Sequence, residues 1–288
     1  EIHERLVGSE MCIRDRFSVT KESGDWMILS HQPFDTEETL SVTINGIFYE
    51  IIVTDTNVSG TIYASNLADN DNLVLTGDTT LVMDVPRKLT SISGDYELNI
   101  EGNNALDVVN PNGDTINVKS LRSSVFLRLI AGKSGVDSDD LVVLNGGVFV
   151  ISELYGIRSD YNAVSIGGGK PVSIYCNQIA IDAGRNVYIE VSNLTIESQY
   201  KGIMSNLLVQ LVGGTINIKS VSCAIHCLGP ILIEDNANIT ASSSNNDAIF
   251  AHMGGNIFIG AGCSITAEGA EYGIHASSNI NIVDGVLN

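Results

Sequence analysis

Apolar side chains recur with a fixed period along the second half of the chain. One register of isoleucines, each preceded by glycine or alanine, returns every 22 to 25 residues, and two further apolar registers follow the same period. A period in this range is typical of a solenoid, in which successive repeats stack as coils. The first register is Ile157, Ile181, Ile203, Ile225, Ile249 and Ile274; the second is Val150, Ile174, Ile196, Ile218, Ile239 and Ile265; the third is Ile166, Ile189, Leu211, Ile233, Ile259 and Ile282.

The residues that flank each register are of types suited to a strand or to a corner between strands. The residue two positions before the third register is always apolar, which places both side chains on one face of a strand. The pattern predicts an all-β chain that forms a right-handed parallel β-helix, with three strands and about 22–25 residues per coil. Small residues that suit the corners lie two positions after the first register (Ser159, Ala183, Ser205, Cys227, Ala251, Ala276) and two positions after the second (Ser152, Cys176, Ser198, Ser220, Ala241, Ala267).

The N-terminal part of the chain does not follow this period. Segments 40–44 and 47–53 alternate around Asn45-Gly46, which is a strong signal for a two-residue β-hairpin. The period begins near residue 73, with 25 residues from Leu75 to Ile100. We therefore expect a small N-terminal β cap over residues 17–71 and the β-helix over residues 72–288. The second register is expected to extend back through Val150, Leu129, Val108 and Val85.

The two ends of the sequence give rise to separate expectations. The segment 8–16, GSEMCIRDR, resembles translated sequencing-adapter read-through, so residues 1–16 are expected to be an artefact or disordered. At the other end, segment 280–288 begins a further coil and stops, which indicates truncation at the C-terminus. On this interpretation the sequence is a fragment that does not include a signal peptide.

The composition narrows the classes of partner. A formal net charge of −19 and a pI near 4.4 disfavour binding to nucleic acid or to an anionic membrane surface. No run reaches the ~18 apolar residues that a membrane-spanning helix needs. Cys223 and Cys227 lie on one predicted strand with their Cα atoms ~13 Å apart, too far for a disulfide. His226 faces away from both thiols, so we expect no metal site at these three residues.

Residues beside the inward registers are expected to point outward. Three outward columns result, of which the third is mostly short and polar, as suits a surface in contact with solvent. The column after the first register is Arg158, Asp182, Met204, His226, Phe250 and His275; the column before the third is Ser165, Tyr188, Gln210, Leu232, Phe258 and Asn281; the column before the second is Phe149, Ser173, Thr195, Asn217, Asn238 and Ser264.

Aromatic and imidazole rings recur in the first two columns, and three tyrosines lie in the turns just before the first register. Rings on a long, flat face can stack on sugar rings, and neighbouring hydroxyl and amide groups can supply hydrogen bonds. Single exposed rings are also common on proteins that bind no sugar. The candidate ligand-binding residues are Tyr155, Tyr188, Tyr200, His226, Phe250, Phe258, Tyr272 and His275.

A catalytic site has less support in the sequence. A polysaccharide lyase on this scaffold needs acidic Ca²⁺ ligands and a basic residue, and the nearest candidates are the acidic group at 137–140 and Arg158. A hydrolase needs two carboxylates within ~5–10 Å of each other, whereas Asp182 and Glu190 face outward on different walls. We therefore assign no catalytic residue and expect a non-catalytic protein.

Three segments carry a resemblance to a known group of proteins: LVLTGDTTL at 73–81, LTSISGDY at 89–96 and GGTINI at 213–218. They resemble bacterial secreted parallel β-helix proteins that bind carbohydrate, a group that includes pectin-binding surface proteins. The resemblance covers about residues 72–288. It implies a secreted or cell-surface adhesin or binder of polysaccharide or host glycan, without a required cofactor and with Ca²⁺ as an optional aid. A polysaccharide lyase-like enzyme and a purely structural surface stalk are the alternatives, because the same scaffold serves all three.

Overall fold

A computed structural model of the protein describes residues 17–22, 25–30, 38–44, 47–53 and 56–287, with side chains described from residue 56 onward. The adapter-like segment 1–16 and the Asn45-Gly46 turn lie outside the described residues. The chain divides into two compact units, residues 1–56 and residues 57–288. Residues 57–71, which the sequence groups with the N-terminal cap, belong to the second unit together with the coils.

The first unit contains two antiparallel strand pairs. Strand β1 (Phe17–Glu22) pairs with β2 (Asp25–Ser30), and β3 (Glu38–Ile44) pairs with β4 (Ile47–Val53). In the second pair Ile44 lies opposite Ile47, as the predicted hairpin requires.

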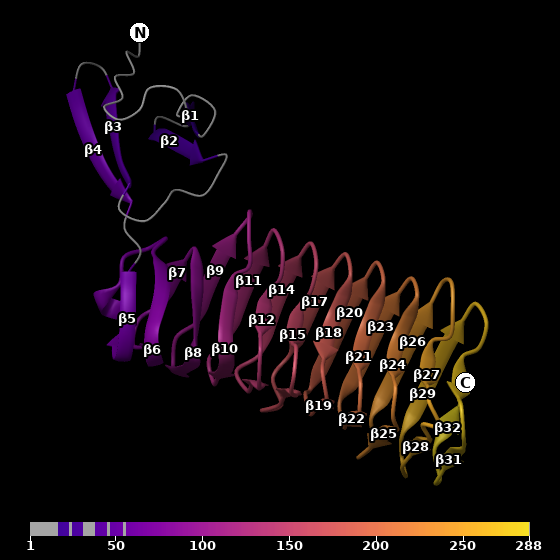
Figure 1. The fold of residues 1–288 in the computed structure, drawn as a ribbon. Helices are drawn as coiled ribbons and strands as arrows, with labels where there is room; N and C mark the ends of the chain where they lie inside the picture. The colour runs from indigo at the N-terminus through magenta and orange to yellow at the C-terminus, as the bar shows by residue number, and fades with distance from the viewer. Residues whose placement is uncertain (1–16, 23–24, 31–37, 45–46, 54–55, 288) are drawn as a thin grey trace. The chain divides into compact units, whose positions relative to one another are not determined.

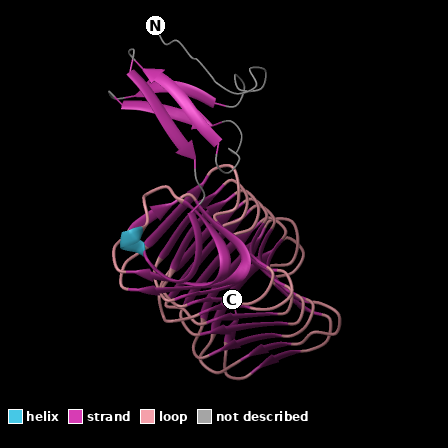
Figure 2. Cartoon of the chain, turned by 60° about the vertical axis from the view of Figure 1, so that its left-hand side comes forward, coloured by secondary structure: helices cyan, strands magenta, loops and turns pink. Residues whose placement is uncertain are grey.

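The second unit is a parallel β-solenoid of stacked coils (Figure 1). Each regular coil contributes one short strand to each of three walls, and Figure 2 shows the loops that join these strands at the corners. The first wall is a sheet of 10 strands: β7 (Arg87–Leu89), β9 (Leu106–Asn110), β11 (Leu127–Ala131), β14 (Val148–Ser152), β17 (Val172–Cys176), β20 (Asn193–Ser198), β23 (Thr215–Ser220), β26 (Asn238–Ser243), β29 (Ser264–Gly269) and β32 (Val286–Leu287).

The second and third walls are built in the same way from the strands that follow in each coil. The second wall contains β12 (Val136–Ser138), β15 (Ile157–Ser159), β18 (Ile179–Ala183), β21 (Lys201–Ser205), β24 (Cys223–Cys227), β27 (Ile249–Ala251) and β30 (Ile274–Ala276). The third wall contains β13 (Val142–Leu144), β16 (Val164–Ile166), β19 (Asn186–Ile189), β22 (Leu208–Val212), β25 (Ile231–Glu234), β28 (Ile257–Ile259) and β31 (Ile280–Ile282).

The N-terminal coils are shorter because one long strand serves two walls. Strands β6 (Asn72–Met83), β8 (Ser91–Gly102) and β10 (Ile116–Ser123) pair in parallel, and β10 in turn pairs with both β12 and β13 of the next coil. Strand β5 (Thr56–Tyr63) neighbours β6, and a short 3₁₀ helix, η1 (Ala64–Asn66), follows it.

These long strands overturn two predicted alignments. Ile100 stacks on Leu81 rather than on Leu75, and Val108 stacks on Leu89 rather than on Val85. Without a turn between the second and third walls a coil needs fewer residues, so the 22–25-residue period does not hold here.

The inward registers form the core, as predicted. The first-register isoleucines from Ile157 to Ile249 are fully buried and stack directly on one another. In the last coil Ile274 is half-buried and Ile282 is exposed, because no further described coil covers them. A Cβ at Gly202 would overlap the carbonyl oxygen of Ala224, which explains the glycine at this position.

The second register slips by two residues between β23 and β26, which corrects the prediction. Ile239 stacks on Ile216, whereas Ile218 faces Ala241. The corner ladder therefore continues from Ser220 to Ser243 and Gly269 rather than to Ala241 and Ala267. On the outside, Asn217 is followed by Thr240 and Thr266 rather than by Asn238 and Ser264.

The described part of the chain contains no helix with the length and apolar character needed to cross a membrane.

Candidate functional site

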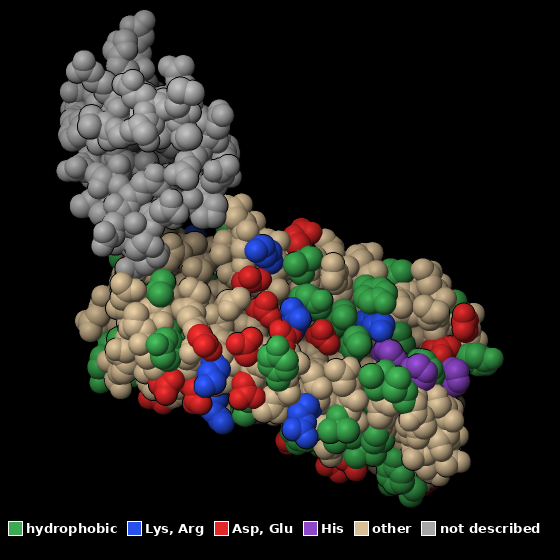
Figure 3. Space-filling view, in the orientation of Figure 1, with side chains coloured by type: hydrophobic (Ala, Val, Ile, Leu, Met, Phe, Trp, Pro, Cys, Tyr) green, Lys and Arg blue, Asp and Glu red, His purple; other side chains and the backbone are tan. Residues whose placement is uncertain are grey.

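The outward column of the second wall contains charged, aromatic and imidazole side chains. In this column Arg158, Asp182, Met204, His226, Phe250 and His275 pair one coil after another, as the sequence predicts. The three described histidines gather near the C-terminal end of this face (Figure 3).

Three rings of this column stack face to face. His226 and Phe250 have ring centroids 5.4 Å apart and planes inclined by 8°, and Phe250 and His275 are 4.6 Å apart at 23°. His252, just beyond β27, stacks on Phe250 at 5.0 Å, and Tyr272 meets His275 at 5.1 Å. The parallel strands hold these side chains in register, so that the rings form a continuous apolar strip flanked by imidazole nitrogens. We call His226, Phe250, His252, Tyr272 and His275 the ring cluster.

A buried carboxylate orients one end of the ring cluster. Asp247 is 6% exposed, and its Oδ2 accepts a hydrogen bond of 2.7 Å from His275 Nδ1. Its Oδ1 accepts another from the backbone N–H of Tyr272 at 3.1 Å. A carboxylate can only accept hydrogen bonds, so Nδ1 of His275 carries a proton. The other ring nitrogen, Nε2, does not contact Asp247. Asp247 thus sets both the ring orientation and the tautomer.

A lysine orients the other end. Nζ of Lys201 lies 2.7 Å from Nδ1 of His226 and 3.8 Å from the sulfur of Met204. An ammonium group can only donate, so Nδ1 accepts and the neutral His226 ring carries its proton on Nε2. That Nε2 atom is buried and has no hydrogen-bond partner among the described residues.

Burial shifts the pKa values at this end of the site. Burial, followed by the charges of Lys201 and His252, lowers the pKa of His226 to about 4. Burial also lowers the pKa of the Lys201 ammonium. No described carboxylate lies within ion-pair distance of Lys201, which is therefore a half-buried cation without a counterion from the described chain.

A cavity of about 380 Å³ opens beside these groups. The ring cluster residues His226, Phe250, His252 and His275 line it together with Tyr200 and Lys201, and Asp247, Glu271, Asn246 and Ser222 supply polar groups. The Lys201 ammonium also lies 5.4 Å from the centroid of the Tyr200 ring. The cavity combines apolar ring faces with donors and acceptors, a combination suited to a ligand that presents both C–H faces and hydroxyl groups.

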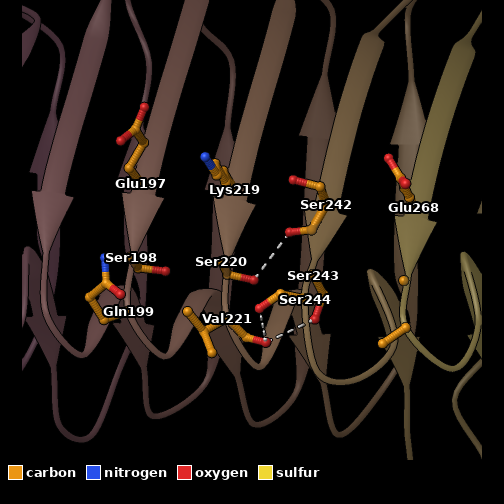
Figure 4. Close-up of a pocket in the computed structure, with 12 residues that line it drawn as sticks. Glu197, Ser198, Gln199, Lys219, Ser220, Val221, Ser242, Ser243, Ser244 and Glu268 are labelled. Carbon is orange, nitrogen blue, oxygen red and sulfur yellow. Dashed lines mark hydrogen bonds between the residues drawn. The ribbon is translucent and has the colours of Figure 1, made fainter.

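A second groove of about 610 Å³, lined mainly by polar residues, runs along the first wall. Glu197, Lys219, Ser242 and Glu268 occupy successive coils of this wall in one row (Figure 4). Several of the serine hydroxyls are already bonded to backbone carbonyls, as in the bond of Ser220 to Ser242. No aromatic side chain lines this groove, so its lining lacks the ring faces that distinguish the 380 Å³ cavity.

The structure brings together five of the eight predicted ligand-binding residues: Tyr200, His226, Phe250, Tyr272 and His275. Tyr155 lies two coils before Tyr200 and packs against Arg158, whose guanidinium is 4.7 Å from the ring centroid. Tyr188 and Phe258 belong to the third wall, where the hydroxyl of Tyr188 donates to Glu190 at 2.7 Å. The predicted set therefore divides between two walls.

The lining residues that the prediction missed include Lys201, Cys223, Asp247 and His252. The first three lie two positions before first-register isoleucines, the same position that Tyr155 and Tyr272 occupy. A periodic reading of that column would have found them. His252 lies in a turn of irregular length and carries no periodic signal.

The two cysteine thiols at or next to the site are poor candidates for reactive groups. Burial raises the pKa of Cys223 to about 12, and its Sγ donates to the carbonyl of Ile225 at 3.3 Å. Cys227 is fully buried in the core. Within the described ranges, no group of His, Cys, Asp and Glu side chains is arranged to hold a metal ion.

No family of known proteins, no curated protein and no solved structure matches this chain. The site is therefore interpreted from its own chemistry.

Proposed function

We propose that the protein binds polysaccharide, without cleaving it, on the second wall of the solenoid, and that it does so as a secreted or cell-surface protein. The ring cluster carries this proposal. Stacked rings at one-coil intervals offer a flat apolar strip, and the cavity beside them contains hydrogen-bonding groups of both kinds.

The polar groups around the rings support a sugar ligand in particular. Sugar rings have apolar C–H faces and polar edges, so they need rings and hydrogen-bonding groups side by side. Here Lys201 supplies donors and Glu271 supplies acceptors among the residues that line the same cavity. Because Lys201 has no described counterion, an anionic substituent on the sugar would also be stabilised there.

The arrangement supports binding more than catalysis. Of the two oriented histidines, His226 already accepts a hydrogen bond from Lys201 at Nδ1 and has its own Nε2–H buried, so it has no free lone pair to act as a base. His275 is oriented by Asp247 but is separated from His226 and Lys201 by the ring of Phe250. Among the described residues, the two oriented histidines therefore do not face each other as an acid–base pair.

Affinity electrophoresis tests the proposal. The protein is run through native gels that contain pectin, polygalacturonate, xylan or a soluble β-glucan, each with Ca²⁺ and with a chelator. Retardation in at least one polysaccharide gel, relative to a gel without polysaccharide, is the expected result. Unchanged mobility in every gel would contradict binding and leave a structural stalk as the better account. Release of unsaturated, ultraviolet-absorbing products would instead favour a lyase.

A further inference from the structure

We propose that the binding surface continues from the ring cluster to Asp182 and Arg158, so that the protein takes a linear polysaccharide running parallel to the solenoid axis. This inference rests on the proposed function and specifies the form of the glycan. A monosaccharide or disaccharide would occupy the cavity alone, whereas a polymer would contact both ends.

The first support is the continuity of the column. Arg158 pairs with Asp182, Asp182 with Met204 and Met204 with His226, each one coil further along the second wall. Five steps of about 4.8 Å place Arg158 and His275 about 24 Å apart along the axis. All the side chains of this column are half-buried and therefore project little from the wall, so a linear sugar chain can lie along it. Figure 3 shows acidic and basic side chains on the same face as the histidines, toward the N-terminal coils.

The second support is the carboxylate of Asp182. It is half-buried, yet it makes no hydrogen bond or ion pair with any described residue. Burial raises its pKa, although the charges of Arg158 and Lys201 oppose the shift. A partly desolvated acceptor is stabilised when it gains donors. The hydroxyl groups of a sugar are donors of this kind.

The third support is the way in which Arg158 is held. Its guanidinium lies 2.6 Å from Asp160, 3.8 Å from Asp137 and 4.7 Å from the centroid of the Tyr155 ring. These contacts restrict a side chain that would otherwise lose entropy on binding. The fixed guanidinium and the unpaired Asp182 offer a donor and an acceptor one coil apart. Lys201 then joins them to the ring cluster through its bond to His226.

The experiment measures affinity against ligand length. Oligosaccharides from disaccharide to octasaccharide, prepared from polygalacturonate and from a neutral β-glucan, are titrated calorimetrically into the wild-type protein. The same titrations are run on Asp182→Ala and on Tyr188→Ala. Tyr188 lies in the same coil as Asp182 but on the third wall, so its variant controls for a general effect on that coil.

We expect affinity to rise at least about tenfold from disaccharide to hexasaccharide, which corresponds to ~1.4 kcal/mol. Asp182→Ala is expected to remove most of that gain while leaving disaccharide affinity within about twofold of wild type. Tyr188→Ala should retain the full gain. Equal affinity for all lengths would overturn the inference, and so would an Asp182→Ala profile equal to that of wild type. In both cases the proposed function would stand, whereas failure to bind any polysaccharide would overturn both.

Discussion

The imidazole of His226 lies parallel to the phenyl ring of Phe250, with 5.4 Å between their centroids and 8° between their planes. The two residues face each other because β24 and β27 pair in parallel with these positions in register. Their stacking is a direct consequence of the one-coil repeat. The Lys201 bond to the same imidazole then determines which ring nitrogen of His226 carries the proton.

Protonation of His226 should make stability depend on pH. An unfolded histidine takes up a proton near pH 6.5, whereas the folded protein resists protonation of His226 until about pH 4. The unfolded state therefore binds more protons across this window, and the free energy of unfolding should fall as the pH is lowered through it. Chemical denaturation at several pH values measures this slope. His226→Phe, which keeps a ring in the stack, should reduce the slope, and an unchanged slope would show that other groups cause it.

Substitutions at Ile203 and at its neighbour Met204 should differ in their effect on stability, because only the first residue lies in the core. Ile203 is fully buried, so Ile203→Asp places an unpaired carboxylate in the core at a cost of several kcal/mol. Because each coil is stabilised mainly by its neighbours, the coils on both sides should unfold with it. Met204→Asp lies one residue further along and faces outward beside the Lys201 ammonium, so it should be nearly silent. Circular dichroism during urea denaturation compares the two. Equal losses would mean that the inward and outward faces are wrongly assigned.

Removal of the Asp247 carboxylate should weaken both the last coils and ligand binding. Asp247→Ala leaves the Tyr272 N–H and His275 Nδ1 without their acceptor, which should cost about 1–3 kcal/mol of unfolding free energy. The His275 ring should also lose its fixed orientation, and affinity for polysaccharide should drop. Asp247→Asn retains one carbonyl oxygen and should recover part of the stability. Wild-type binding by Asp247→Ala would show that His275 needs no such support.

The solenoid could be predicted from the sequence because three independent apolar registers repeat together. The predicted alignment of the second register is wrong at Ile239 for a physical reason. Side chains in a strand alternate with a period of two, so Ile239 fits equally well above Ile216 or Ile218, and the pattern alone cannot choose. The structure selects Ile216. The early alignments of Leu75 and Val85 failed because long strands replace the corner turns that set the regular coil length.

The candidate site could be predicted only in part. His226, Phe250 and His275 follow directly from the column after the first register. Which wall the ligand prefers depends on the groups around the rings, and these lie in turns and strand ends. Lys201 and Asp247 occupy a periodic position, two residues before first-register isoleucines, but their roles depend on bonds to residues in other coils, which the period does not reveal.

The most direct test compares two phenylalanines that lie in the same coil on different walls. Phe250 stands at the centre of the ring cluster, and Phe258 occupies the outward column of the third wall. Dissociation constants are measured in the polysaccharide gel that most retards the wild-type protein. We expect Phe250→Ala to raise the dissociation constant about tenfold, or ~1.4 kcal/mol, and Phe258→Ala to leave it within about twofold. Equal effects of the two substitutions, or a larger effect at Phe258, would contradict a binding surface on the second wall.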